Sequence, residues 1–236
     1  MDSFATLEAL LGARPVAARW PPITPAAQTK PYRTVKALLD GVLAGALLVF
    51  LAPVLLFISL LIVLDSPGWP IYRQWRKGYR QQNFQMYKFR TMRLNAHAEQ
   101  ASLLSRNEAD GIIFKLKTDP RITRMGRFLR KYSIDEVPQL LNVVLGEMSL
   151  IGPRPFPLED FSRPAHPDPL YPQWIQERHH MLPGMSGLWQ VLGRNNLPFE
   201  KLIRLDLLYV RYWSLRMDAW VFWKTFAAVL FNRGAY

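Results

Sequence analysis

The chain has 236 residues, half of them apolar, which suffices for one sizeable domain with a packed core. Its 30 Lys and Arg residues outnumber its 18 Asp and Glu residues, and the net charge of +12 indicates a negatively charged partner: nucleic acid, an anionic membrane surface or a phosphorylated substrate. Cysteine is absent, which excludes disulfides, Cys-ligated zinc and thiol nucleophiles.

The first 32 residues are predicted to form a flexible leader. They hold Pro15, Pro21, Pro22, Pro25 and Pro31, and they lack the early apolar block of a secretory signal. Their pattern suggests one short helix near residues 3–12.

Residues 41–64 are uncharged and long enough to cross a hydrocarbon core of about 30 Å as one helix. Two features favour another arrangement. Pro53 lies in the middle, where its missing N–H and its ring predict a kink. Both flanks are basic, which favours the cytoplasmic side for each of them. We therefore predict a re-entrant membrane helix over residues 33–66, bent at Pro53, with a transmembrane helix as the alternative and a cytoplasmic domain over residues 67–236.

A basic amphipathic segment covers residues 119–131. Its apolar residues recur at helical spacing, with cations between them: Ile122, Met125, Phe128 and Leu129 against Arg121, Arg124, Arg127, Arg130 and Lys131. Most of these cations fit the solvent-exposed face of a helix whose apolar residues pack against the core. Alternatively, the helix lies at an anionic lipid surface, and its C-terminal end brings Arg130 near the acids that follow.

Those acids, Asp135 and Glu136, are predicted to lie at a helix N-terminus. Ser133 and Glu136 match a capping box, which is a structural role, although Pro138 means either that the first turn is irregular or that the regular helix starts near Pro138. A helix N-terminus also favours negative charge, so both carboxyls are expected to stay ionised with depressed pKa values. Ionised carboxylates suit catalysis as well: one can hold Mg²⁺ while the other attacks a polarised electrophile. The residues themselves leave capping and catalysis open.

Several cations occur beside turns. Arg154 lies between the two prolines of GPRP (152–155), which limit the freedom of the turn and suit bidentate phosphate binding, although a simple turn is the alternative. Lys88 and Arg90 occur in KFRTM (88–92), and Arg194 occurs in GRN (193–195). Together with the acidic pair, these cations indicate a site for a polyphosphate substrate with Mg²⁺. The glycine patterns of P-loops and dinucleotide-binding folds are missing from the sequence.

The C-terminal segment 205–231 is rich in aromatic residues, which prefer a membrane–water interface. Charged residues interrupt it, so it is not expected to span a membrane. We predict a pair of interfacial amphipathic helices, with an ordinary aromatic core helix as the alternative.

Three motifs, in this order, resemble the bacterial sugar transferase family, the monotopic phosphoglycosyl transferases: YKFRTM, DPRITRMGRFLRKYSIDEVPQLLNVVLGEMSLIGPRP and PGMSGLWQVLGRN. The resemblance covers about residues 33–236. FKLKTDPRIT and the ending NRGAY look most like the catalytic region of the galactose- and glucose-phosphate transferases. Larger members carry an N-terminal four-helix membrane domain and a further soluble domain, so a compact form is expected here.

The resemblance implies a function and a set of roles. The enzyme is expected to transfer hexose-1-phosphate from a UDP-sugar, UDP-glucose or UDP-galactose, to undecaprenyl phosphate, releasing UMP. Asp135 matches the family's nucleophile, which forms a phosphosugar-aspartyl intermediate, and Glu136 matches its Mg²⁺-associated acid. Arg154 matches the phosphate-binding arginine of the Pro-Arg-Pro motif, and Arg130 a basic residue before the acidic pair.

The implied architecture is mainly α with a small β-hairpin: a monotopic membrane protein with a Pro-broken re-entrant helix and interfacial helices under a cytoplasmic catalytic domain. The resemblance implies a location at the cytoplasmic face of the bacterial inner membrane, with anionic lipids as partners. It leaves the oligomeric state open. The implied reaction is the first membrane step of exopolysaccharide, capsule or O-antigen synthesis.

The sequence departs from the family pattern at a few positions. Ala52 replaces a serine before Pro53, Leu182 replaces a basic residue before Pro183, and Ser186 replaces a threonine. Two other functions are weighed against the enzyme: a non-catalytic, membrane-anchored scaffold of a glycan-assembly complex, and a basic nucleic-acid-binding protein. The intact acidic pair argues against the scaffold, and the uncharged segment argues against nucleic acid.

Overall fold

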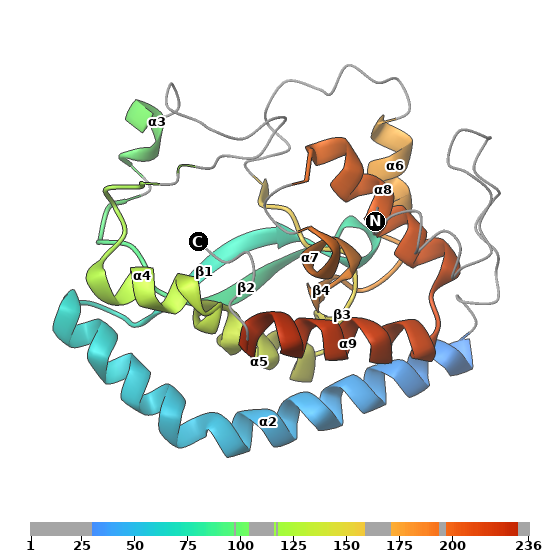
Figure 1. Cartoon of the computed structure of the whole chain (residues 1–236), viewed down its shortest axis with the longest axis horizontal. Coiled ribbons are helices and arrows are strands. Elements are labelled where there is room, and N and C mark those ends of the chain that lie inside the picture. The colour runs from blue at the N-terminus through green and yellow to red at the C-terminus, as the bar shows by residue number, and fades with distance from the viewer. Residues whose placement is uncertain are drawn as a thin grey trace.

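The computed structural model of the chain describes residues 30–96, 98–103, 116, 118–158, 171–193 and 197–230. It is mostly helical with one antiparallel hairpin, as predicted (Figure 1). Its elements are α2 (Lys30–Asp65), β1 (Ile71–Lys77), η2 (Tyr79–Gln81), β2 (Asn83–Phe89), α3 (Gln100–Leu103), α4 (Arg124–Lys131), η4 (Ile134–Gln139), α5 (Leu140–Val144), β3 (Ser149–Ile151), α6 (Tyr171–Arg178), β4 (Gly184–Ser186), α7 (Leu188–Leu192), α8 (Phe199–Tyr212) and α9 (Leu215–Leu230). The predicted leader, with its helix near residues 3–12, lies outside the described residues up to residue 29.

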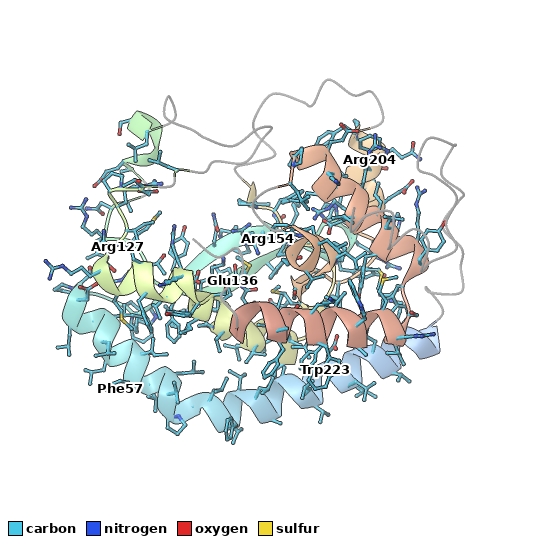
Figure 2. The ribbon with its side chains drawn as sticks, viewed as in Figure 1. Phe57, Arg127, Glu136, Arg154, Arg204 and Trp223 are labelled. Atoms are coloured by element: carbon cyan, nitrogen blue, oxygen red, sulfur yellow. The ribbon has the colours of Figure 1, made fainter. Side chains whose placement is uncertain are left out.

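The long apolar segment forms one continuous helix, α2, with Pro53 inside it. Figure 1 shows α2 along one side of the molecule, bent so that both of its ends turn toward the other elements. In the part of the chain that the structure describes, it is the one helix long and apolar enough to cross a membrane, by length and composition. Only 11% of the most apolar stretch of α2 is buried within the protein. Most of its apolar side chains, Phe57 among them, therefore need to be covered by something outside the chain (Figure 2). Whether α2 spans a membrane or re-enters one stays a prediction.

Cysteine labelling checks this topology, because the natural chain has no cysteine. Thr34 and Arg73, both exposed, lie at the start of α2 and just beyond its end. We expect single cysteines at these two positions, in sealed membrane vesicles of known orientation, to react with a membrane-impermeant maleimide from the same side. A cysteine at Phe57 is the control and should stay unreactive, since lipid covers it in either topology. Labelling of positions 34 and 73 from opposite sides would establish a transmembrane helix instead.

The C-terminal aromatic segment divides into two helices with different surroundings. Helix α8 is a core helix: Leu205, Leu207 and Tyr209 are all at most 1% exposed. The prediction of an interfacial pair is therefore wrong for α8, because it packs against α6 and α7. Helix α9 does present an exposed aromatic group, with Trp223 at 66% and Phe226 at 52% exposure. In Figure 2, Trp223 points from α9 toward the side of the molecule where α2 lies.

A buried ion pair joins the first part of α2 to α9. The Lys36 ammonium donates to the Asp218 carboxylate at 2.6 Å and lies 3.1 Å from the Asp40 carboxylate. The Tyr209 hydroxyl donates to Asp218 at 2.6 Å, and the Ser149 hydroxyl donates to Asp40 at 2.5 Å. Lys36 and Asp40 precede the uncharged segment 41–64 in the sequence, and in the structure they attach α2 to the rest of the protein.

Replacing Lys36 with Met is expected to destabilise the fold by about 3–5 kcal/mol, because two carboxylates with side chains only 12–14% exposed lose their buried cation. The double variant Lys36→Met/Asp218→Asn should recover part of this loss, since one of the unpaired charges is gone. The measurement is the midpoint of thermal or chemical unfolding in detergent. Arg204→Met is a matched control that breaks an exposed pair with Glu200 and should cost less than about 1 kcal/mol. An equal effect of Lys36→Met and Arg204→Met would contradict the anchoring role.

The basic segment forms a shorter helix than predicted, because α4 begins at Arg124. Arg121 precedes it and is 3% exposed, with its guanidinium on the Asp119 carboxylate at 2.6–3.2 Å. It therefore does not belong to a solvated basic face. Arg127 is exposed on α4 (Figure 2). The apolar residues of α4 are not all part of the core, since Leu129 is fully buried but Phe128 is 50% exposed.

Candidate active site

Asp135 and Glu136 lie on η4, a six-residue 3₁₀ helix between α4 and α5. The predicted capping box is wrong: Ser133 has a left-handed backbone conformation (φ 57°), and its side chain makes no capping hydrogen bond. In a capping box the Ser133 hydroxyl would accept the Glu136 N–H. Here the Ser133 carbonyl accepts that N–H instead, at 3.3 Å. An irregular first turn, expected from Pro138, is confirmed. The Glu136 carboxylate is thus available for other partners.

Two cations from distant segments bind the same oxygen of Glu136. The Lys88 ammonium, from β2, lies 2.7 Å from Glu136 Oε1, and the Arg154 guanidinium, from the turn after β3, lies 3.1 Å from it. The three side chains are 15–28% exposed, so the cluster remains partly open to solvent. Figure 2 shows Glu136 and Arg154 close together in the middle of the molecule.

The two acids differ in their electrostatics. Burial by itself would raise the pKa of the Glu136 carboxyl, but Arg154 and Lys88 hold that pKa well below its usual range. Burial raises the pKa of the Asp135 carboxyl above its usual range, and the charges of Lys88 and Arg130 only partly oppose this. The expectation of two depressed pKa values is therefore correct for Glu136, through ion pairs rather than a helix terminus, and wrong for Asp135.

Arg130 lies near the acidic pair at the last turn of α4. Its Nε donates to Thr91 Oγ1 at 2.9 Å, and its charge acts on Asp135. The close packing of α4 depends on Gly126, where a Cβ would come 2.1 Å from the Thr91 carbonyl oxygen. Sequence reasoning missed Thr91, which lies in the same KFRTM motif as Lys88.

The other two predicted cations have different positions. Arg90 donates to the carbonyls of Ser66, Pro67 and Gly68, so it binds the chain just beyond α2 instead of the Glu136 cluster. The cause is tertiary: β2 ends where α2 ends, and the free carbonyls there attract a buried guanidinium. Arg194 lies outside the described residues.

Arg154 extends from a turn that packs tightly against the Pro-Gly motif. Gly152 N–H donates to the Ser186 carbonyl and Gly184 N–H to the Pro153 carbonyl, at 2.8 and 2.9 Å. A Cβ on Gly184 would come 2.0 Å from the Gly152 nitrogen, so the two turns require glycine for their close approach. The Arg154 guanidinium carbon also lies 5.4 Å from the centre of the Trp189 ring, within range of a cation–π contact.

Asp135 and Glu136 fit Mg²⁺ only if substrate phosphates and water supply the remaining ligands. Among the described residues, no group of three or more His, Cys, Asp or Glu comes together to hold a metal ion. Asp135 and Glu136 offer two carboxylates, and Mg²⁺ commonly binds through one or two carboxylates and completes its shell with substrate phosphates and water. The cations around the pair suit those same phosphates.

Comparisons with known proteins identify relatives over most of the chain. The family model for bacterial sugar transferases matches residues 31–232. The chain is 38% identical over 200 residues to a galactosyl transferase, CpsE, of Streptococcus agalactiae, covering 84% of this chain and 41% of the relative. It is 38% identical to the UDP-glucose:undecaprenyl-phosphate glucose-1-phosphate transferase of Xanthomonas campestris, covering 87% of this chain and 40% of the relative. It is 36% identical to the exopolysaccharide production protein ExoY of Sinorhizobium fredii, covering 84% of this chain and 86% of the relative. The chain thus spans less than half the length of the first two relatives and most of the third.

Proposed function

Because the chain belongs to the bacterial sugar transferase family, we propose that it transfers hexose-1-phosphate from a UDP-sugar to undecaprenyl phosphate and releases UMP. The observation that carries the proposal is the cluster in which Lys88 and Arg154 bind Glu136 beside the half-buried Asp135. A diphosphate substrate needs cations on its oxygens and a nucleophile next to them, and this cluster offers both. The names of two relatives, a galactosyl transferase and a glucose-1-phosphate transferase, support UDP-galactose or UDP-glucose as the donor.

In the first half-reaction, a carboxylate oxygen of Asp135 attacks the phosphorus that carries the sugar. The bond from that phosphorus to the bridging oxygen of the diphosphate breaks, and UMP leaves with the bonding electrons. Asp135 then carries the sugar phosphate as an acyl phosphate. Lys88, Arg154 and Arg130 offset the charge that develops on the phosphate oxygens.

In the second half-reaction, a phosphate oxygen of undecaprenyl phosphate attacks the same phosphorus. The carboxylate of Asp135 leaves, and the product is a sugar diphosphate-linked lipid. The covalent relay means that UMP departs before the lipid phosphate arrives, so two anionic substrates need not occupy the cation cluster together. Mg²⁺, when bound, polarises the transferring phosphoryl group, and Glu136 with the substrate phosphates would hold it.

The proposed location is the cytoplasmic face of the bacterial inner membrane. The exposed apolar side chains of α2 and the exposed aromatic residues of α9 support contact with lipid, and the net charge of +12 supports anionic headgroups as partners. The proposed task is the first membrane step in the synthesis of exopolysaccharide, capsule or O-antigen, and of these three products the name of the ExoY relative supports exopolysaccharide.

A UMP-release assay tests this function. The full chain in membrane vesicles or detergent is mixed with Mg²⁺, undecaprenyl phosphate and, in turn, a panel of UDP-sugars. We expect UMP from UDP-glucose or UDP-galactose in amounts that match the glycolipid formed. If no UDP-sugar gives UMP, the protein is not a transferase of this type, and the non-catalytic scaffold becomes the better account.

A further inference from the structure

All three carbonyls of the Pro-Arg-Pro turn are bound by donors from other parts of the chain. The Pro153 carbonyl accepts from the Gly184 N–H at 2.9 Å. The Arg154 carbonyl accepts from Arg178 Nη2 at 2.6 Å, and the Pro155 carbonyl accepts from Arg76 Nη1 at 2.9 Å. Both of these arginines are buried, with 2% and 8% exposure. Buried guanidinium groups need hydrogen-bond partners, and here each arginine finds one of them in a backbone carbonyl of the turn.

Arg178 is itself fixed by the core. Its Nη2 also donates to the carboxylate of Asp206, and both side chains of this pair are only 1% exposed. Its guanidinium carbon lies 3.8 Å from the centre of the Phe156 ring. Burial raises the pKa of the Asp206 carboxyl to about 6, and the charge and hydrogen bond of Arg178 oppose that rise. Asp206 is the one acid in the apolar stretch 205–210 of α8, and that isolation in the sequence is a sign that could have marked it.

We propose that Arg178 and Asp206 form a positioning pair that holds the backbone of Arg154 and thereby sets where its guanidinium meets Glu136 and the substrate phosphates. The kinetic part of this proposal rests on the proposed function, but the structural part does not. The pair touches no reacting atom and acts through Arg154. Its effect follows from the geometry. The turn has no N–H at either proline, so its orientation depends on what its carbonyls and the N–H of Arg154 bind. Arg178 binds the Arg154 carbonyl, and the Asp206 carboxylate accepts the Arg154 N–H.

The paired variant Arg178→Met/Asp206→Leu tests the proposal, because it removes both charges together and leaves no unpaired buried ion. We expect kcat/KM for the UDP-sugar to fall about 10- to 100-fold, the effect of a misplacement near 1 Å. In an Arg154→Ala background the same pair of changes should alter kcat/KM by less than about twofold, because the side chain that they position is gone. Equal losses in the two backgrounds would show a general structural role and would overturn the proposal.

The chain offers a matched control on the same two helices. Glu177 of α6 and Arg211 of α8 form a second ion pair at 2.5 Å, with 12% and 6% exposed side chains. It joins the two helices as the first pair does, but the three carbonyls of the Pro-Arg-Pro turn accept from Gly184, Arg178 and Arg76 and not from this pair. The variant Glu177→Leu/Arg211→Met should therefore leave kcat/KM within about twofold of the natural protein. A loss as large as that of the Arg178/Asp206 variant would mean that any ion pair between α6 and α8 supports activity.

A second readout does not need turnover. With 5-fluorotryptophan in the protein, the ¹⁹F resonance of Trp189 can be assigned by its loss in Trp189→Phe, and it reports the guanidinium of Arg154 beside the ring. Arg154→Ala should shift this resonance, the Arg178/Asp206 variant should shift it in the same direction, and the Glu177/Arg211 control should not. An unmoved resonance in the Arg178/Asp206 variant would overturn the proposal.

If that variant does not fold, Asp206→Asn is compared with the natural protein in the same way, because it keeps the shape of the side chain and removes the charge that fixes Arg178. Should the natural protein release no UMP, the proposed function fails, while the ¹⁹F result still decides the positioning role.

Discussion

Asp135→Asn is expected to lower the rate of UMP release by about 10⁴-fold, because an amide cannot form the acyl phosphate. The covalent adduct should disappear as well. Mixing the natural protein with UDP-sugar and Mg²⁺, without lipid carrier, should add the mass of one hexose phosphate to the intact chain. The variant should show no added mass in the same mass-spectrometric measurement.

The stability of Asp135→Asn separates a chemical defect from a folding defect. Burial raises the pKa of the Asp135 carboxyl, so the fold favours its protonated form, and the stabilisation that protonation gives is lost as the pH rises through that raised pKa. A neutral amide avoids this loss. We therefore expect the variant to unfold at the same temperature as the natural protein or higher, with the gap opening as the pH rises through the raised pKa of Asp135 and staying constant above it.

Asp65→Asn is the matched control for this experiment. Its carboxylate is exposed and accepts the Met125 N–H at 2.9 Å, far along the chain from the acidic pair. It should retain activity and adduct. Retention of activity by Asp135→Asn would remove Asp135 as the nucleophile and leave the acidic pair with a role in binding alone.

The sequence predicted the parts of the site that depend on local chemistry. The irregular turn at η4 follows from the missing N–H of Pro138. The two prolines restrict the backbone around Arg154, but donors from other parts of the chain bind the carbonyls of that turn. The partners of other cations could not be read in this way. Arg90 and Arg121 look like Lys88 in sequence, yet one binds carbonyls beyond α2 and the other binds Asp119. Which partner a buried cation meets is decided by how the elements pack.

The same limit explains the error about α8. Both C-terminal helices contain aromatic residues at helical spacing, and periodicity records that a face is apolar without recording what covers it. Helix α8 meets α6 and α7, whereas the Trp223 face of α9 stays exposed. The fold class needed only composition and motif order, but the burial of each helix required the tertiary structure.

Glu136→Gln is expected to reduce kcat/KM by about 10- to 100-fold and to raise the Mg²⁺ concentration needed for half-maximal activity, because the glutamine keeps the shape of the side chain and removes its charge. Lys88 gives a second, independent readout. Burial lowers the pKa of its ammonium, and the charge of Glu136 raises it back in part. Without that charge the pKa of Lys88 falls further, so Lys88 loses its proton at a lower pH. The basic limb of the pH–rate profile should then move to lower pH.

Glu147→Gln serves as the control for Glu136→Gln, because the Glu147 carboxylate accepts from the Asn142 side chain at 2.7 Å and does not bind the site cations. It should leave both the Mg²⁺ dependence and the pH profile unchanged. The two readouts of Glu136→Gln can also disagree, and each disagreement has a meaning. A shifted pH profile with an unchanged Mg²⁺ dependence would assign Glu136 to holding Lys88 and Arg154 alone and would count against a metal ligand. A changed Mg²⁺ dependence with an unshifted profile would mean that the ion pair with Lys88 opens when the substrate binds, so that Glu136 exchanges the ammonium for the metal.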